Sequence, residues 1–176
     1  FQEKEDNTYA LKDVRHILVG YEGGTTDESG KTVYSDAEKA AAYEQAENLL
    51  ALYEMTAMTE QDFAELATAN TDDTASAATG GLYEDITPAE GVYVAEFTDW
   101  ATDESRKTGD TGIVETEYGY HVMYYVGDDE MTYRDSMIFE EIKTETVSAW
   151  YNDILATGTA TEKDTSLLNK DIVLAQ

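Results

Sequence analysis

The chain has 176 residues, 41% of them hydrophobic and 11% aromatic, which suits one globular domain and leaves no room for a second of ordinary size. Its 38 acidic and 11 basic residues give a formal net charge of −27. This charge excludes nucleic acid as a partner, because phosphate binding needs clustered lysine and arginine, and it disfavours anionic lipid. The absence of cysteine excludes disulfides, thiolate catalysis and cysteine-ligated zinc.

Membrane-spanning and targeting segments are not evident in the sequence. No apolar run approaches the roughly 20 residues that cross a bilayer. The first residues, Phe1 to Asn7, do not resemble a signal peptide. We therefore expect any export signal or lipid anchor to have been removed or never present.

The first predicted strand is Val14–Val19, a β-branched stretch that is followed by glycines. Two helices follow, one from Ser35 to about Ala57 and one from Thr59 to about Asn70. Each begins with a capping box, in which a hydroxyl residue and an acidic residue three positions later bond to each other's backbone N–H. Four apolar positions recur at helical spacing in the first helix and predict its buried face: Ala42, Ala46, Leu49 and Tyr53.

The middle of the chain predicts a loop, a short helix and a hairpin. Residues 71–81 are small and polar, which is typical of a loop with up to one helical turn. Thr87 followed by Pro88 predicts the start of a short helix that continues to about Ala101. Turn residues then separate two apolar stretches that predict antiparallel strands, Thr111–Thr116 and Tyr120–Val126.

The last predicted element is a helix from Thr132 to Thr157, ended by Gly158. It lies outside the hairpin and carries apolar residues on one stripe. Residues 159–176 are polar apart from a final apolar patch, which fits a strand and a helix equally well. The order of elements predicts an α+β fold, with helices packed against one sheet.

Four stretches carry a resemblance to a known family: Val14–Val19, Asp62–Ala67 leading into Thr71–Asp73, Gly80–Leu82, and Thr116–Val122. In this order and approximate spacing they resemble parvulin-type peptidyl-prolyl cis/trans isomerases, in particular secreted bacterial foldases of the PrsA and SurA type. The resemblance covers about residues 13–126. Each stretch alone is a weak signal, and the four together are specific.

The resemblance implies a four-stranded antiparallel sheet flanked by helices, with the first and last strands at its centre and His16 beside His121. The residues themselves predict only three strands, so we expect the fourth near residues 81–84 or 87–93. A C-terminal helical extension follows. The expected organisation is a lead segment (1–12), a parvulin-like isomerase domain (13–127), and a C-terminal helix and tail (128–176).

The resemblance also implies the site. It assigns four catalytic positions: His16, Asp73, Thr116 and His121. It assigns four substrate-binding positions: Leu82, Tyr93, Phe97 and Tyr118. The chain departs from the family at Tyr93, where methionine is usual, at Tyr118, where a small hydroxyl residue is common, and at Thr102, where an aromatic residue is usual. Lys31 is the one basic residue of the loop 20–34, so we expect no phosphopeptide selectivity.

The chemistry implied is rotation about the peptide bond before proline, without a covalent intermediate. The barrier of roughly 18 to 20 kcal/mol reflects amide resonance, so groups that favour the twisted amide accelerate exchange. Without the resemblance, two histidines on adjacent strands would more simply be hydrogen-bonded core residues. A second function therefore stays open, in which the same fold is a peptide-binding chaperone module with little or no isomerase activity.

We expect no cofactor and no metal. Asp72–Asp73 and Asp128–Glu130 lack the alternating oxygen ligands and central glycine of a calcium loop. The expected partners are unfolded or extended proline-containing polypeptides, and the expected location is extracytoplasmic, either secreted or on the cell surface of a bacterium. The stripe of Ile142, Trp150 and Ile154 is expected to pack on the isomerase domain or on a second copy of the chain.

Overall fold

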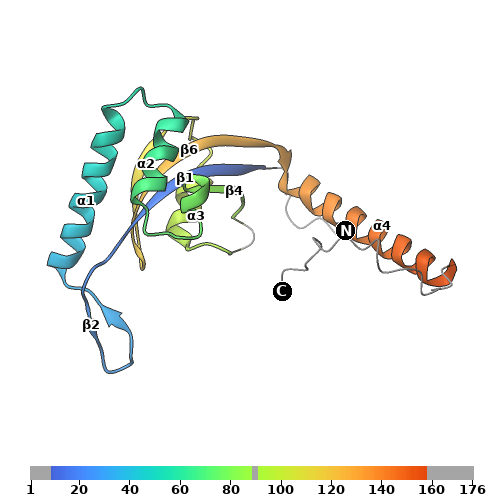
Figure 1. The fold of residues 1–176 in the computed structure, drawn as a ribbon, viewed down its shortest axis with the longest axis horizontal. Helices are drawn as coiled ribbons and strands as arrows, with labels where there is room; N and C mark the ends of the chain where they lie inside the picture. Colours follow the sequence, from blue (N-terminus) through green and yellow to red (C-terminus); the bar gives the residue numbers. More distant parts are fainter. Residues whose placement is uncertain (1–8, 89–90, 158–176) are drawn as a thin grey trace, which may run out of the picture. The chain divides into compact units, whose positions relative to one another are not determined.

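The computed structural model describes residues 9–88 and 91–157. The elements run in the order β1 (Ala10–Gly20), β2 (Thr25–Thr26), β3 (Thr32–Val33), α1 (Asp36–Glu54), α2 (Glu60–Asn70), a 3-10 turn η1 (Ala77–Thr79), β4 (Leu82–Ile86), α3 (Ala95–Ala101), β5 (Thr111–Thr116), β6 (Gly119–Thr132) and α4 (Tyr133–Thr157). The chain divides into two compact units, Phe1–Arg134 and Asp135–Gln176. Figure 1 shows the order of these elements by colour.

The first unit is built on a four-stranded antiparallel sheet with strand order β4-β1-β6-β5. The first and last strands are therefore central, as the family resemblance implied. The fourth strand is β4, which begins within one of the two expected regions. A separate two-stranded hairpin, β2 with β3, lies in the loop after β1, and the sequence analysis did not predict it.

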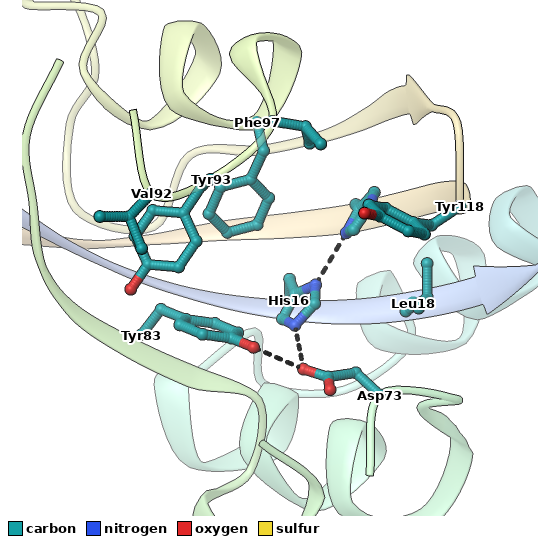
Figure 2. A pocket seen from close by; sticks show the side chains of 10 residues that line it. His16, Leu18, Asp73, Tyr83, Val92, Tyr93, Phe97 and Tyr118 are labelled. Carbon is teal, nitrogen blue, oxygen red and sulfur yellow. Dashed lines mark hydrogen bonds and ion pairs between the residues drawn. The ribbon is translucent and has the colours of Figure 1, made fainter. Parts of the chain in front are cut away.

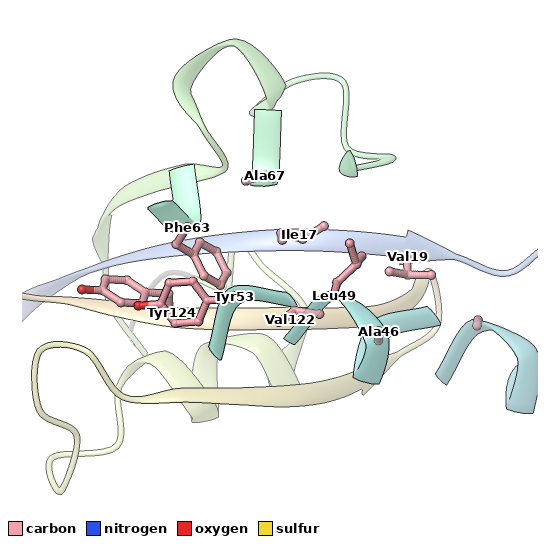
Figure 3. Close-up of a cluster of buried hydrophobic side chains, with 10 residues drawn as sticks. Ile17, Val19, Ala46, Leu49, Tyr53, Phe63, Ala67, Val122 and Tyr124 are labelled. Atoms are coloured by element: carbon pink, nitrogen blue, oxygen red, sulfur yellow. The ribbon is translucent and has the colours of Figure 1, made fainter. Parts of the chain in front are cut away.

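The two faces of the sheet carry different side chains because successive strand residues point to opposite sides. Ile17 and Val19 of β1 belong to a core shared with α1 and α2, which Figure 3 shows with Phe63 beside Tyr124. The alternate residue Val14 belongs to a second core, which packs against α3. His16 shares the face of Val14, so the sheet directs it away from the larger core.

The predicted starts of α1 and α2 and the predicted buried face of α1 are confirmed. Ser35 and Glu38 form a complete capping box at α1, and Thr59 and Asp62 form one at α2. The buried residues of α1 are the four that helical spacing predicted: Ala42, Ala46, Leu49 and Tyr53. Helix α1 ends at Glu54, slightly before the predicted end at Ala57.

Three predicted boundaries are wrong, the first because β1 begins at Ala10, four residues before the predicted start at Val14. The short helix does not begin at Thr87 and Pro88 but at Ala95, and Gly91 between them has φ +59°, a left-handed conformation that interrupts a helix. The last strand does not end at Val126 but continues to Thr132. Its polar end is stabilised in the sheet by β1, because buried Lys12 makes a 2.8 Å ion pair with Asp128.

Helix α4 carries many large hydrophobic side chains that are at least 38% exposed. They include Ile142, Trp150 and Ile154, the stripe that the sequence singled out, and Trp150 is 63% exposed. The expected stop at Gly158, the tail 159–176 and most of the lead segment 1–12 lie outside the described residues. Among the helices of the described ranges, none is long and apolar enough to span a bilayer.

Gly81 fixes the approach of β4 to β1. Its φ is +72°, and a Cβ there would lie 2.1 Å from the carbonyl oxygen of His16. We expect Gly81→Ala to lower the free energy of unfolding by about 1 kcal/mol for the left-handed backbone and by a further ~1 to 3 kcal/mol for the overlap. Urea unfolding followed by circular dichroism measures this change.

Gly30 provides a matched control, because its φ is +86° and a Cβ there would meet nothing within 4 Å. Gly30→Ala should cost only the backbone strain of about 1 kcal/mol. Equal destabilisation by Gly30→Ala and Gly81→Ala would contradict the claim that the backbone contact at Gly81 sets the geometry of this edge.

Candidate active site

The sheet register brings the two histidines together. Leu18 of β1 is the cross-strand partner of His121, and His16 is opposite Met123, two residues away from His121. The histidines are therefore diagonal neighbours on one face of the sheet, within reach of each other's side chains. Their Nδ1 atoms lie 2.9 Å apart, and their rings are 3% (His16) and 6% (His121) exposed.

Asp73 reaches His16 from the loop between α2 and β4. The loop is attached to β1 at two points: Asp72 N–H donates to the Leu18 carbonyl, and His16 N–H donates to the Gly81 carbonyl, both at 2.9 Å. Between these points the Asp73 carboxylate oxygen Oδ2 lies 3.0 Å from His16 Nε2. The backbone of β1 thus holds the loop in register with the histidine pair.

Three donors surround Oδ2 of Asp73. Besides His16, the hydroxyls of Ser76 and Tyr83 donate to this oxygen at 2.5 and 2.9 Å. Burial by itself would raise the pKa of Asp73, but the hydrogen bonds from Ser76, Tyr83 and His16 outweigh it and lower the pKa to about 2. Asp73 is therefore a carboxylate, and an acceptor only, at any pH near neutrality.

The histidine pair is neutral. Burial lowers the pKa of His16, and the opposing effect of Asp73 is smaller. Burial, followed by the repulsion that a protonated His16 would exert, lowers the pKa of His121 to about 4. Two neutral imidazoles each have one N–H donor and one acceptor nitrogen, so their hydrogen bonds have a direction.

That direction follows from the carboxylate. Because Asp73 can only accept, His16 must carry its proton on Nε2, and its Nδ1 accepts from His121 Nδ1–H. The free lone pair of His121 is then on Nε2, which lies 2.9 Å from the hydroxyl of Thr116 and accepts from it. Tyr118 N–H in turn donates to that hydroxyl at 3.2 Å. All four ring nitrogens are satisfied within the protein.

A pocket of about 310 Å³ opens above this network. Figure 2 shows Tyr83, Tyr93 and Phe97 on one side of His16, and Leu18 and Tyr118 on the other. The rings of Tyr93 and Phe97 lie 5.6 Å apart, and Phe97 makes an edge contact with His16 at 5.4 Å. The pocket therefore has aromatic walls and a polar floor.

Most sequence-predicted site residues lie together here. The pocket is lined by six of the eight: His16, Asp73, Tyr93, Phe97, Tyr118 and His121. Thr116 is buried behind the lining, bonded to His121. Leu82, which was expected in the pocket, is not among its lining residues; it pairs with Arg15 of β1, and its neighbour Tyr83 lines the pocket instead.

Sequence reasoning missed Tyr83, Ser76 and the aliphatic residues Leu18, Val92 and Val94. Strand alternation indicates only that Leu82 and Tyr83 point to opposite faces, so it marks Tyr83 as the alternative to Leu82 without deciding between them. No comparable signal marked Val92, which lies in an irregular segment. Among the described residues, no cluster of three or more histidine or acidic side chains could hold a metal ion.

The site is thus a buried, neutral histidine pair beneath an aromatic pocket on a four-stranded antiparallel sheet. In the comparison with protein families, residues 1–128 match the model of the PPIC-type PPIase domain. The chain therefore belongs to this family. A search of curated proteins finds no match.

Solved structures similar to this chain include PrsA of Bacillus anthracis (21% identity, TM-score 0.46) and PrsA of Bacillus subtilis (22%, 0.46). The alignments cover 74% and 90% of this chain, and 48% and 54% of the PrsA chains. A SurA-like chaperone of Campylobacter jejuni is similar at 18% identity and a TM-score of 0.45, over 88% of this chain and 57% of the other. The chain thus spans about half the length of these structures.

The depressed pKa of His121 predicts a pH dependence of stability. The unfolded histidine, with a pKa near 6.5, is protonated below that pH, whereas the folded one stays neutral down to about pH 4. The stabilisation is complete above pH ~6.5 and is lost as the pH falls toward 4, so wild type should lose about 2 kcal/mol between pH 7 and 5 from this group. Urea unfolding at both pH values measures it.

His121→Gln is the control, because glutamine keeps a polar side chain and removes the titration. The surface carboxylates titrate in both proteins, so the difference between wild type and variant isolates the contribution of His121. If wild type and His121→Gln show the same change in unfolding free energy between pH 7 and 5, His121 is not buried as a neutral base.

Proposed function

We propose that the chain catalyses cis/trans isomerisation of peptide bonds before proline, in extended or unfolded polypeptides. The observation that carries the proposal is the pocket whose aromatic walls (Tyr83, Tyr93, Phe97) stand directly over the hydrogen-bonded floor of His16 and His121. A pyrrolidine ring is apolar and compact, so it suits the walls. The amide that twists during the reaction is polar, so it suits the floor.

The proposed mechanism needs no covalent step. All four imidazole nitrogens are hydrogen-bonded inside the protein, which leaves none available as a nucleophile. The network instead provides a rigid polar surface whose dipoles are already oriented, so it does not reorganise as the amide twists. Holding the ring while the preceding peptide group rotates favours the twisted state over both planar forms, and each ~1.4 kcal/mol of preference gives about tenfold in rate.

His16, Asp73, Thr116 and His121 form this floor, and Tyr93, Phe97 and Tyr118 bind substrate. Tyr118 is 59% exposed at the rim, where it can contact residues on either side of the proline. The hairpin loop between β1 and α1 is poor in cations, and its Lys31 lies 3.9 Å from Glu117. A phosphate before the proline would therefore meet no cluster of positive charge.

Exchange NMR on a short alanine–proline peptide tests the activity. We expect wild type to raise the exchange rate well above the uncatalysed one, and Phe97→Ala to lower kcat/KM by roughly tenfold because it removes a wall of the pocket. Val33→Ala, on the exposed β3 strand, should behave as wild type. A wild-type rate equal to the uncatalysed rate would refute the proposed activity.

Two further peptides sharpen the result. A phosphoserine–proline peptide should be turned over no faster than the matching glutamate–proline peptide. A marked preference for the phosphopeptide would contradict the claim that the loop between β1 and α1 does not bind phosphate. Saturable binding of the alanine–proline peptide without faster exchange would favour the alternative function, a peptide-binding chaperone module with the same fold.

We also propose that the clients are exported polypeptides and that the protein acts outside the cytoplasm. The support is the resemblance of four sequence stretches to secreted foldases, together with membership of the family. Fractionation of the source cells with an antibody to the chain tests the location. Recovery only from the cytosolic fraction would contradict it.

Helix α4 is proposed to mediate self-association. Its exposed apolar side chains, among them Ile142, Phe139 and Trp150, present a hydrophobic surface. Burial of this surface against a second copy of the chain would stabilise a dimer. We expect sedimentation equilibrium to show a dimer for wild type and a monomer for Trp150→Glu. A wild-type monomer with the fluorescence maximum of a water-exposed tryptophan would contradict the proposal.

A further inference from the structure

Tyr83 occupies a place where the family resemblance led us to expect a leucine. Its ring makes edge contacts with His16 at 5.0 Å, with Tyr93 at 5.3 Å and with Phe97 at 5.9 Å, so it is part of the aromatic wall. Its hydroxyl donates to Asp73 Oδ2 at 2.9 Å, as Figure 2 shows. One side chain therefore contacts both the pocket and the end of the histidine network.

We propose that Tyr83 is a positioning residue, which holds the Asp73 carboxylate in place and so fixes the proton order of His16 and His121. The inference rests on the proposed isomerase function only for its kinetic consequence. The order of protons is a property of the resting protein and can be measured without substrate.

The donors to Asp73 come from different elements of the fold. Ser76 belongs to the same loop as Asp73, three residues further on, and it moves with Asp73 if the loop shifts. Tyr83 comes from β4 and His16 from β1, so their hydrogen bonds fix the carboxylate relative to the sheet. Tyr83 therefore fixes Asp73 relative to the sheet, which Ser76 cannot do.

The hydroxyl of Tyr83 is a dependable donor. Burial, followed by the hydrogen bond to Asp73, raises the pKa of Tyr83 to about 12, so it keeps its proton at physiological pH. Without the Tyr83 hydroxyl, Asp73 Oδ2 retains Ser76 and His16 as donors, and the Ser76 hydroxyl also lies 3.3 Å from His16 Nε2. A carboxylate that turns away from His16 would leave that serine as the partner of Nε2, and a hydroxyl accepts as well as donates. Both tautomers of His16 then become available.

The coupling also has a consequence for substrate binding. The ring of Tyr83 lies beside the place proposed for the pyrrolidine ring, and its hydroxyl ends at Asp73. Seating of the proline against this ring restricts the side chain whose hydroxyl steadies the carboxylate. Occupation of the pocket and order in the histidine network are therefore linked through one residue.

Tyr83→Phe tests the proposal, because it removes the hydroxyl and keeps the ring. We expect kcat to fall roughly five- to tenfold, as loss of one hydrogen bond of ordinary net strength predicts, with KM within about twofold of wild type because the wall remains. In imidazole nitrogen-15 NMR of wild type, His16 should be protonated on Nε2 and His121 on Nδ1. In Tyr83→Phe both rings should show a mixture of tautomers.

Tyr43→Phe is the matched control, since it removes the same atom from an exposed tyrosine of α1 outside the pocket, and it should leave kinetics and tautomers unchanged. Ser76→Ala should disturb the tautomers less than Tyr83→Phe does. Wild-type tautomers in Tyr83→Phe would overturn the proposal, even if the variant were less stable. Should wild type fail to accelerate isomerisation, the proposed function falls, and the tautomer measurement still decides the role of Tyr83.

Discussion

The arrangement of the site depends on one hydrogen bond, that between the Nδ1 atoms of His16 and His121. It forms because the two central strands pair in a register that makes these residues diagonal neighbours on one face of the sheet. A hydrogen bond between two neutral imidazoles has a fixed donor and acceptor only if one of the rings also bonds to a group that can accept and cannot donate. Asp73, with a pKa lowered to about 2 by its three donors, meets that condition, and the order of donors then extends through both rings to Thr116.

The same burial that keeps the imidazoles neutral also shapes what the site can do. Neutral, fully bonded rings are poor nucleophiles and poor general acids, so the site is suited to a reaction that breaks only amide resonance. The aromatic walls supply the complementary part, an apolar surface for a ring that must be held still. The apolar wall and the polar floor meet at Tyr83. Its ring belongs to the wall, and its hydroxyl belongs to the floor.

Sequence reasoning predicted the caps of α1 and α2, the buried stripe of α1 and the pairing of β5 with β6, because these depend on local patterns. It placed His16 beside His121 only through the family resemblance, since the register of distant strands is not a local property. It misplaced the pocket residue of β4 by one position, because alternation shows which residues share a face and not which face is the groove. The ion pair of Lys12 with Asp128 extended β6 for an equally non-local reason. The later start of α3 accompanies the left-handed backbone of Gly91, a conformation that glycine permits but does not require.

The proposed function requires that a proline ring occupy the pocket between the aromatic walls and the histidine floor. Intermolecular nuclear Overhauser effects between a labelled proline peptide and the protein measure this directly. We predict contacts from the pyrrolidine protons to the rings of Tyr83, Tyr93 and Phe97. If saturating peptide gave contacts only to residues elsewhere on the chain and none to these three rings, the account would be contradicted.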